Sequence, residues 1–223
     1  MLRLVLSVLV LACAGASCAT AGAWLREEGK GFLAYSNLTA SSLDSTFSAY
    51  LDYGYRENLT IGATIDLEAP LGRPVIGKGV IFARRPLNWG GAEANWAYEI
   101  GIGARYTGLA FVPVATTGLS YGKGITWGPR NGWLAVDASV EWDLGTAQRV
   151  VKVDTTLGMS LGERSKGMLQ VFTAYGSGWS NVTIAPSYIF QTKKQKINYV
   201  VGLQNSSLTP NVIAIKIGVW QTF

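Results

Sequence analysis

The strongest constraint on the fold is a side-chain period of two that recurs along almost the whole chain. From residue 29 onward, segments of about ten residues alternate between apolar and small or polar side chains, and turn residues separate them. In residues 133–144 every even position is apolar, while the odd positions include Asp137, Glu141 and Asp143. Such alternation is typical of β-strands, because successive side chains point to opposite faces. The sequence therefore predicts an all-β protein.

Counting these segments predicts about twelve strands. They span residues 29–37, 46–56, 59–67, 79–85, 96–106, 109–121, 133–144, 151–161, 167–175, 182–191, 197–205 and 211–223. Loops are predicted at residues 68–78 and 86–94, and a bulge or a local break in pairing at Pro113, because proline has no N–H to donate. An even count is what a single-chain barrel needs when both ends of the chain lie on the same side of a membrane.

The low charge of the chain indicates that much of its surface does not face water. Only 15% of the residues are charged, against a usual share of about 25%. After residue 21 no apolar run is long enough for a transmembrane helix, and the only other spanning structure is a closed barrel. The polar strand faces are mostly Gly, Ala, Thr and Ser, which suits a crowded interior better than a wet surface. We therefore expect an antiparallel up-and-down transmembrane β-barrel; the alternative is a secreted β-sandwich whose apolar faces meet in a core.

The first residues predict export. Arg3 supplies a positive charge, residues 4–11 an apolar core, and Ala19-Thr20-Ala21 a cleavage site, so residues 1–21 are expected to be a signal peptide and residues 22–223 the barrel. Both cysteines lie in the segment that would be removed, which would leave the mature chain without thiols. The alternative is a lipoprotein signal in which Cys13 carries the lipid.

Two stretches resemble known proteins. Residues 211–223 carry aliphatic side chains at alternate positions and end on Phe223, and in this they resemble the C-terminal strand of bacterial outer-membrane β-barrels, although Gln221 departs from that pattern. Residues 51–62 and the start Gly22-Ala23-Trp24 are similar to those of a family of small, largely uncharacterised proteobacterial outer-membrane proteins. The resemblance implies a location in the bacterial outer membrane, and a last strand that closes on the first. It also implies that Phe223 is an assembly signal for the barrel assembly machinery.

The lumen of such a barrel must pair its charges, because an unpaired charge at low dielectric costs several kcal/mol. The charged side chains expected there are Asp52, Arg56, Asp66, Glu99, Arg105, Asp137, Glu141, Lys152, Asp154 and Lys216. Which of them pair depends on how the strands align, which the sequence leaves open.

Catalysis is not expected. The chain contains no histidine, which excludes the usual serine and cysteine nucleophile sites with an imidazole base and the common zinc sites. A Ser-Lys or paired-carboxylate site is left open, but we expect the carboxylates of residues 133–144 to be structural. The bases are scattered apart from two groups, Arg84-Arg85 and residues 193–196. We interpret residues 193–196 as a solvated turn. Without a basic cluster on one element, no nucleic-acid partner is expected. No cofactor is expected either.

The sequence favours a passive function. We expect a narrow, porin-like channel for small solutes, in contact with outer-membrane lipids. The alternative is a structural or surface-interaction barrel whose lumen is plugged by side chains and which transports nothing. In that alternative, the loops at residues 38–44, 69–77 and 176–181 would make the functional contacts. Twelve strands leave the choice open, because eight-stranded barrels are filled by side chains and sixteen-stranded ones hold an aqueous pore.

Overall fold

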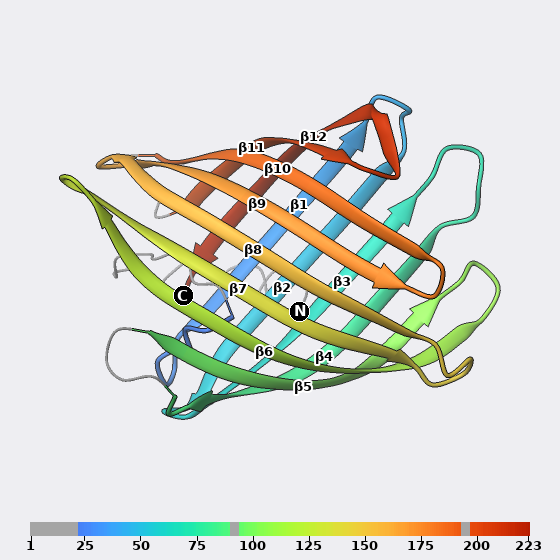
Figure 1. Cartoon of the computed structure of the whole chain (residues 1–223), viewed down its shortest axis with the longest axis horizontal. Coiled ribbons are helices and arrows are strands. Elements are labelled where there is room, and N and C mark those ends of the chain that lie inside the picture. The colour runs from blue at the N-terminus through green and yellow to red at the C-terminus, as the bar shows by residue number, and fades with distance from the viewer. Residues whose placement is uncertain (1–21, 90–93, 193–196) are drawn as a thin grey trace, which may run out of the picture.

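The computed structural model describes residues 22–89, 94–192 and 197–223, and its strands form one closed antiparallel barrel in which each strand pairs with its neighbours in sequence (Figure 1). The twelve strands are β1 (Gly31–Ala40), β2 (Ser45–Arg56), β3 (Leu59–Ala69), β4 (Ile76–Leu87), β5 (Asn95–Tyr106), β6 (Phe111–Trp127), β7 (Arg130–Asp143), β8 (Arg149–Gly162), β9 (Ser165–Gly176), β10 (Trp179–Gln191), β11 (Ile197–Ser206) and β12 (Thr209–Thr222). The predicted up-and-down barrel is confirmed, and the β-sandwich alternative is wrong. No helix among the described residues is long and apolar enough to cross a membrane.

The barrel closes where β12 pairs with β1. Their register runs from Phe32 opposite Thr222 to Ala40 opposite Ala214. Beyond it, the N–H of Gly31 donates to the carbonyl of Phe223 at 2.7 Å, and the N–H of Phe223 donates back at 2.9 Å. The ring of Phe223 covers Gly31 so closely that a Cβ there would lie 2.3 Å from a ring carbon. Both ends of the barrel domain therefore meet at one rim, which we call the termini end; the opposite rim is the far end.

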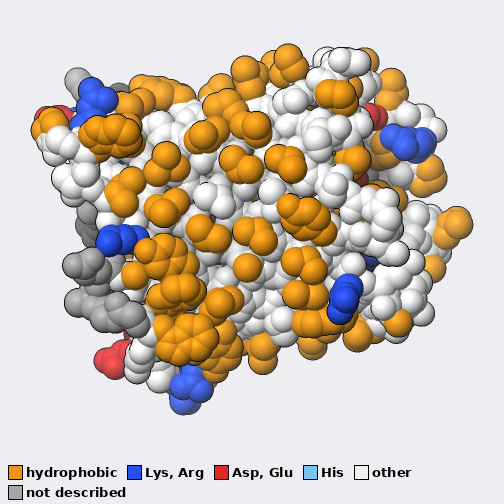
Figure 2. Space-filling model, viewed as in Figure 1, with side chains coloured by type: hydrophobic (Ala, Val, Ile, Leu, Met, Phe, Trp, Pro, Cys, Tyr) orange, Lys and Arg blue, Asp and Glu red, His pale blue; other side chains and the backbone are white. Residues whose placement is uncertain are grey.

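The apolar strand faces point outward, as the alternation predicts. Exposed aliphatic side chains cover the middle of the barrel wall, and on the face in Figure 2 most charged side chains lie toward the two ends. The belt includes Leu51, Ile61, Ile65, Ile81, Ile100, Ile102, Leu157, Leu169, Ile184, Val201, Leu203, Ile213, Ile215 and Ile217. The small and polar faces point inward. The barrel is thus inverted relative to a soluble protein, with its oily side out.

Exposed aromatic side chains flank this belt at both rims. At the termini end these are Tyr53, Tyr55, Trp89, Trp127, Tyr188, Phe190 and Phe223, and at the far end Phe47, Phe111, Tyr175 and Trp179. Such girdles are typical of barrels that cross a bilayer, because an aromatic side chain has an apolar body and tolerates the headgroup region.

The strands are longer, and the loops shorter, than the sequence predicted. The segment predicted at residues 79–85 is the twelve-residue strand β4, and the predicted loops at residues 68–78 and 86–94 lose residues to β3 and β4. The three loops of the surface-interaction alternative contract to residues 41–44, 70–75 and 177–178. Ladder hydrogen bonds extend each strand past the point where alternation ends, because a backbone pairs whatever side chains it carries. The predicted turn at residues 193–196 lies outside the described residues.

Proline acts at a different place from the predicted one. β5 and β6 pair in a constant register through Pro113, without a bulge, and pairing of β6 with β7 begins only at Val114. In β10 and β11, by contrast, no residues are paired between Ile184 and Ser187, where Pro186 lies, although the register is the same on both sides. Pro113 is tolerated because it lies near the start of its strand, before the register with β7 begins, and its carbonyl still accepts from the N–H of Leu144 at 2.9 Å.

Residues 22–30 precede β1 and form what we call the N-terminal strap. At its base, the N–H of Gly29 donates to the carbonyl of Gly54, and the N–H of Gly54 donates to the carbonyl of Lys30, both at 2.9 Å. Further along, the N–H of Arg26 donates to Oγ1 of Thr60 on β3 at 3.0 Å. Ala23 is buried against β6, since a Cβ at Gly122 would lie 2.8 Å from that of Ala23. The strap therefore crosses the interior from β2 and β3 to the opposite wall.

Candidate functional site

The candidate site is the lumen, whose walls are the inward faces of the strands. The alternation that exposes apolar side chains outside places the polar ones inside, so charges far apart in the sequence meet across the interior. They form two networks and one pair of carboxylates.

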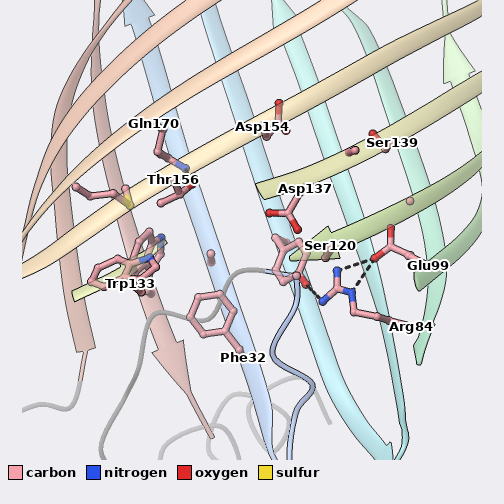
Figure 3. Close-up of a pocket in the computed structure, with 17 residues that line it drawn as sticks. Phe32, Arg84, Glu99, Ser120, Trp133, Asp137, Ser139, Asp154, Thr156 and Gln170 are labelled. Carbon is pink, nitrogen blue, oxygen red and sulfur yellow. Dashed lines mark hydrogen bonds and ion pairs between the residues drawn. The ribbon is translucent and has the colours of Figure 1, made fainter. Parts of the chain in front are cut away.

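The first network, which we call the strap network, ties the strap to the barrel wall. Nε of Arg26 lies 2.5 Å from Oδ1 of Asp52, and the hydroxyl of Tyr50 donates to Oδ2 of Asp52 at 2.8 Å. Arg84 on β4 donates from Nη1 to the Tyr50 hydroxyl at 3.1 Å and from Nη2 to Oε2 of Glu99 at 2.6 Å (Figure 3). Asp52 is 0% exposed. It is stable as a buried charge because two guanidinium groups flank it, Arg84 at 3.8 Å.

The second network, which we call the far network, lies nearer the far end. Glu141 on β7 accepts from Lys78 at 2.9 Å and from Lys152 at 3.2 Å, and it pairs with Arg105. Arg105 also lies 3.4 Å from Asp143. The Lys78 contact joins β4 to β7, so it is a chord across the lumen rather than a contact between neighbouring strands. A second chord joins Nζ of Lys216 on β12 to Oε1 of Gln170 on β9 at 3.2 Å.

Two carboxylates between the networks face each other. Asp137 on β7 lies directly opposite Asp154 on β8 in the strand register. Like charges at opposed positions destabilise a sheet. Both line a cavity of about 340 Å³, whose wall also includes Glu99, Ser120 and Gln170 (Figure 3). Among the described residues, no group of three or more His, Cys, Asp or Glu side chains is placed to hold a metal ion.

Aromatic side chains narrow the lumen below this cavity, toward the termini end. Phe32 contacts both Tyr50 and Trp220 edge to face, with ring centroids 6.2 Å apart in each case, and Tyr50 stacks on Phe82 at 5.8 Å. The guanidinium of Arg26 lies 4.5 Å above the centre of the Phe32 ring. A small apolar cluster of Met168, Ile189 and Val200, packed against Trp133 and Trp220, fills the other side. Rings and strap therefore both occupy the lumen at this level.

Nine of the ten charges considered in the sequence analysis lie on inward faces. Asp52, Glu99, Arg105, Asp137, Glu141, Lys152, Asp154 and Lys216 take the positions given above, and Asp66 accepts from the Ser48 hydroxyl at 2.8 Å. Arg56 does not join them. It is exposed at the end of β2 with its guanidinium 5.5 Å from the centre of the Tyr55 ring. The cause is the register shift between Gly54 and Arg56, which interrupts the alternation at the rim.

Three basic residues at the centre of the networks were missed by sequence reasoning. Arg26 precedes the first strand, and Lys78 fell in a predicted loop. Arg84 lies in a segment whose two faces both carry apolar side chains: Val80 and Phe82 are buried, whereas Ile81 is exposed. The spacing of Lys78 and Arg84, an even number of residues apart, was the available signal that they share a face.

Comparison with known proteins shows the same architecture. No protein-family profile matches the sequence, and no curated protein matches it either. Solved structures do match. The KdgM porin in complex with disordered oligogalacturonate superposes with a TM-score of 0.59 at 9% sequence identity, over 86% of this chain and 99% of that one. The KdgM porin alone gives a TM-score of 0.59 at 8% identity with the same coverage. At this identity the likeness is one of fold, and it establishes that this chain has the barrel architecture of those porins.

Proposed function

We propose that this protein is an outer-membrane barrel that acts as a narrow, porin-like channel for small solutes. The observation that carries the proposal is the inverted arrangement of its side chains: an aliphatic belt between aromatic girdles outside, and ion-paired charges and a cavity inside. An aliphatic exterior of this extent must be covered, and the aromatic girdles at both rims favour lipid as its cover. A charged, hydrated interior offers a path for polar molecules.

The same surface supports the proposed location. Residues 1–21 would direct export and be removed before Gly22, and the barrel assembly machinery would insert residues 22–223 into the outer membrane. Phe223 would be its signal, and the closing contact between Phe223 and Gly31 supports a role for this residue in joining the last strand to the first. In this orientation the termini end faces the periplasm and the far end faces outside.

The expected solutes are small. The two chords, from Lys78 to Glu141 and from Lys216 to Gln170, divide the lumen. The cavity of about 340 Å³ corresponds to roughly ten water molecules. The KdgM porin was solved with oligogalacturonate, a polyanion. A polyanion would have to pass Asp137 and Asp154 here, so we propose that this lumen excludes such chains.

A second candidate is an occluded barrel that conducts nothing. The strap favours it, because residues 22–30 cross the termini end and are fixed there by Arg26. Such a barrel would stabilise the membrane or present its far end outside. The far-end turns described above are short, so a binding role for them has little surface to work with.

Conductance in planar bilayers distinguishes the two candidates. The purified, refolded chain 22–223 and a variant without residues 22–28 would be compared in the same salt. Small current steps from the native protein, and larger ones from the shortened protein, are expected for a narrow channel. A native protein that is silent at every voltage, beside a shortened one that conducts, would overturn the channel and support the occluded barrel.

A further inference from the structure

The tip of the strap ends beside a carboxylate on the opposite wall. A Cβ built on Gly22 would lie 2.5 Å from Oδ1 of Asp137 and 2.6 Å from Oγ of Ser120. The backbone nitrogen of Gly22 is two bonds from that position, so it lies within about 5 Å of Oδ1 of Asp137. A positive charge at this nitrogen would be near enough to form an ion pair.

Asp137 needs such a charge. Its Oδ1 is buried and, among the described residues, has no hydrogen-bond partner. Its neighbour across the strands is another carboxylate, Asp154. Among the described residues that line the cavity, the one basic side chain is Arg84, and it already binds Glu99 and Tyr50. A buried carboxylate oxygen without a partner, beside a second carboxylate, is costly unless a cation joins them.

The chain itself can supply this cation. Hydrolysis of the peptide bond between Ala21 and Gly22 by a signal peptidase consumes one water molecule and leaves a carboxylate on Ala21 and an ammonium group on Gly22. Before cleavage the nitrogen is a neutral amide with one hydrogen. Afterwards it carries a charge and three hydrogens at neutral pH. Glycine also suits the position sterically, because any side chain would collide with Asp137 and Ser120.

We propose that the α-ammonium group of Gly22, created by removal of residues 1–21, forms an ion pair with Asp137 in the lumen and locks the N-terminal strap across the barrel. The inference rests on the cleavage proposed above and adds a site to it. The strap is then held at two points: Arg26 binds Asp52 near β2, and Gly22 binds Asp137 on the opposite wall. The barrel completes its lumen only in the processed form, because the leader must be gone before the lock can form.

Chemical protection of the α-amine tests the lock. The chain 22–223, produced so that it starts at Gly22 and refolded in detergent micelles, would be treated with 2-pyridinecarboxaldehyde, which reacts selectively with N-terminal amines. Mass spectrometry would follow the rate. The folded native chain is expected to react at least about tenfold more slowly than the Asp137→Asn variant, since a buried charge-assisted bond must break first. Glu163→Gln removes an equal charge from an exposed turn and is expected to react as slowly as the native chain.

A second variant guards against misfolding of Asp137→Asn. One alanine added before Gly22 moves the ammonium group by about 3.8 Å and leaves the barrel sequence intact. It is expected to lose the protection as well. Equal rates in the native, Asp137→Asn and extended chains would overturn the lock, whichever of them conducts ions.

The processing step has its own readout. Protein purified from outer membranes would be sequenced from its N-terminus, and a start at Gly22 is expected. A different start, or absence from the outer membrane, would overturn the proposed processing or location, while the refolded chain still reports on the pair between Gly22 and Asp137. The two proposals therefore fail separately.

Discussion

Burial decides which ion pair contributes most to this barrel. Asp52 is fully enclosed, and its partners Arg26 and Arg84 are nearly so. Replacing Asp52 with Asn would leave the buried guanidinium of Arg26 without its anion, whereas Arg84 would keep Glu99. We expect the free energy of unfolding to fall by about 3–5 kcal/mol, measured by urea titration of the protein in lipid vesicles. Glu57→Gln, in the exposed turn that follows the same strand, is the control and should change it little. Equal effects of the two variants would contradict this view of the strap network.

Glu141 pairs with three bases and Asp52 with two, yet we expect Glu141 to matter less. Two of its three bases, Arg105 and Lys152, have side chains about one-third exposed, so water can solvate them when the carboxylate is lost. Glu141→Gln should lower the free energy of unfolding by about 1–2 kcal/mol in the same urea titration. Glu68→Gln, exposed at the end of β3, is the matched control. A loss larger than that of Asp52→Asn would show that the number of partners outweighs burial.

The turn at residues 41–44 carries a pH-sensitive contact. Asp44 accepts from the backbone N–H of Leu71 at 2.7 Å and from the Ser42 hydroxyl at 2.8 Å, and these bonds lower the pKa of its carboxyl below 3.8. A lowered pKa stabilises the folded turn above about pH 4 and loses that contribution as the pH falls further. Hydrogen exchange of the Leu71 amide should therefore accelerate between pH 4 and lower values beyond the intrinsic trend. In Asp44→Asn this pH dependence should vanish; its persistence would assign the effect to another group.

Individual side chains were predictable from the sequence only where one strand face was clearly apolar. Asp137 and Glu141 stood out because every position between them and beyond alternated. Arg26 and Arg84 did not, because the sequence does not reveal that a segment outside the sheet enters the lumen, nor which face of a doubly apolar strand points inward. Their partners are set by the order of the strands in the closed barrel. β2 and β4 both pair with β3, so a side chain on β4 can reach one on β2 although the two are not close in the sequence.

At the scale of elements, the base of the strap approaches β2 very closely. A Cβ at Gly54 would lie 2.1 Å from the carbonyl oxygen of Glu27, so Gly54→Ala must displace the strap from β2. We expect this variant to expose the strap to protease and to raise conductance. Gly124→Ala on β6 is the control, because nothing lies within 4 Å of the added methyl group. Unchanged protease sensitivity in Gly54→Ala would show that the close approach of Glu27 to Gly54 does not hold the strap in place.

Element boundaries and element existence were predictable to different degrees. All twelve strands were expected from alternation, because a lipid-facing and a lumen-facing side chain must take turns along each one. Their lengths were not: β4 carries Lys78 and Arg84 inside and Ile81 outside, and only pairing with β3 and β5 defines its ends. Pairing with the adjacent strands extends each strand beyond its alternating residues, and the sequence of one segment carries no information about those adjacent strands.

At the scale of the whole molecule, the apolar belt is expected to face lipid, and a charge placed in the belt tests this. Ile100 lies near the middle of β5 with its side chain 56% exposed, whereas Leu109 lies in a far-end turn and is 94% exposed. In water the two positions would tolerate a charge alike, Leu109 somewhat better. In a bilayer, Ile100→Lys should lower the free energy of unfolding by about 2–4 kcal/mol, because a lysine at the midplane must leave water. Leu109→Lys should cost about 0–1 kcal/mol, because it stays at the interface.

Refolding into lipid vesicles, followed by urea titration, measures both values. The same two variants in detergent micelles serve as a control for the fold itself, since a micelle adapts its thickness around a charge and should reduce the difference. If Ile100→Lys inserted into vesicles as readily as Leu109→Lys, the belt would not face lipid, and a partner protein would have to cover it. If only Ile100→Lys is destabilised in vesicles, the aliphatic belt and the aromatic girdles mark the depth of the membrane around this barrel.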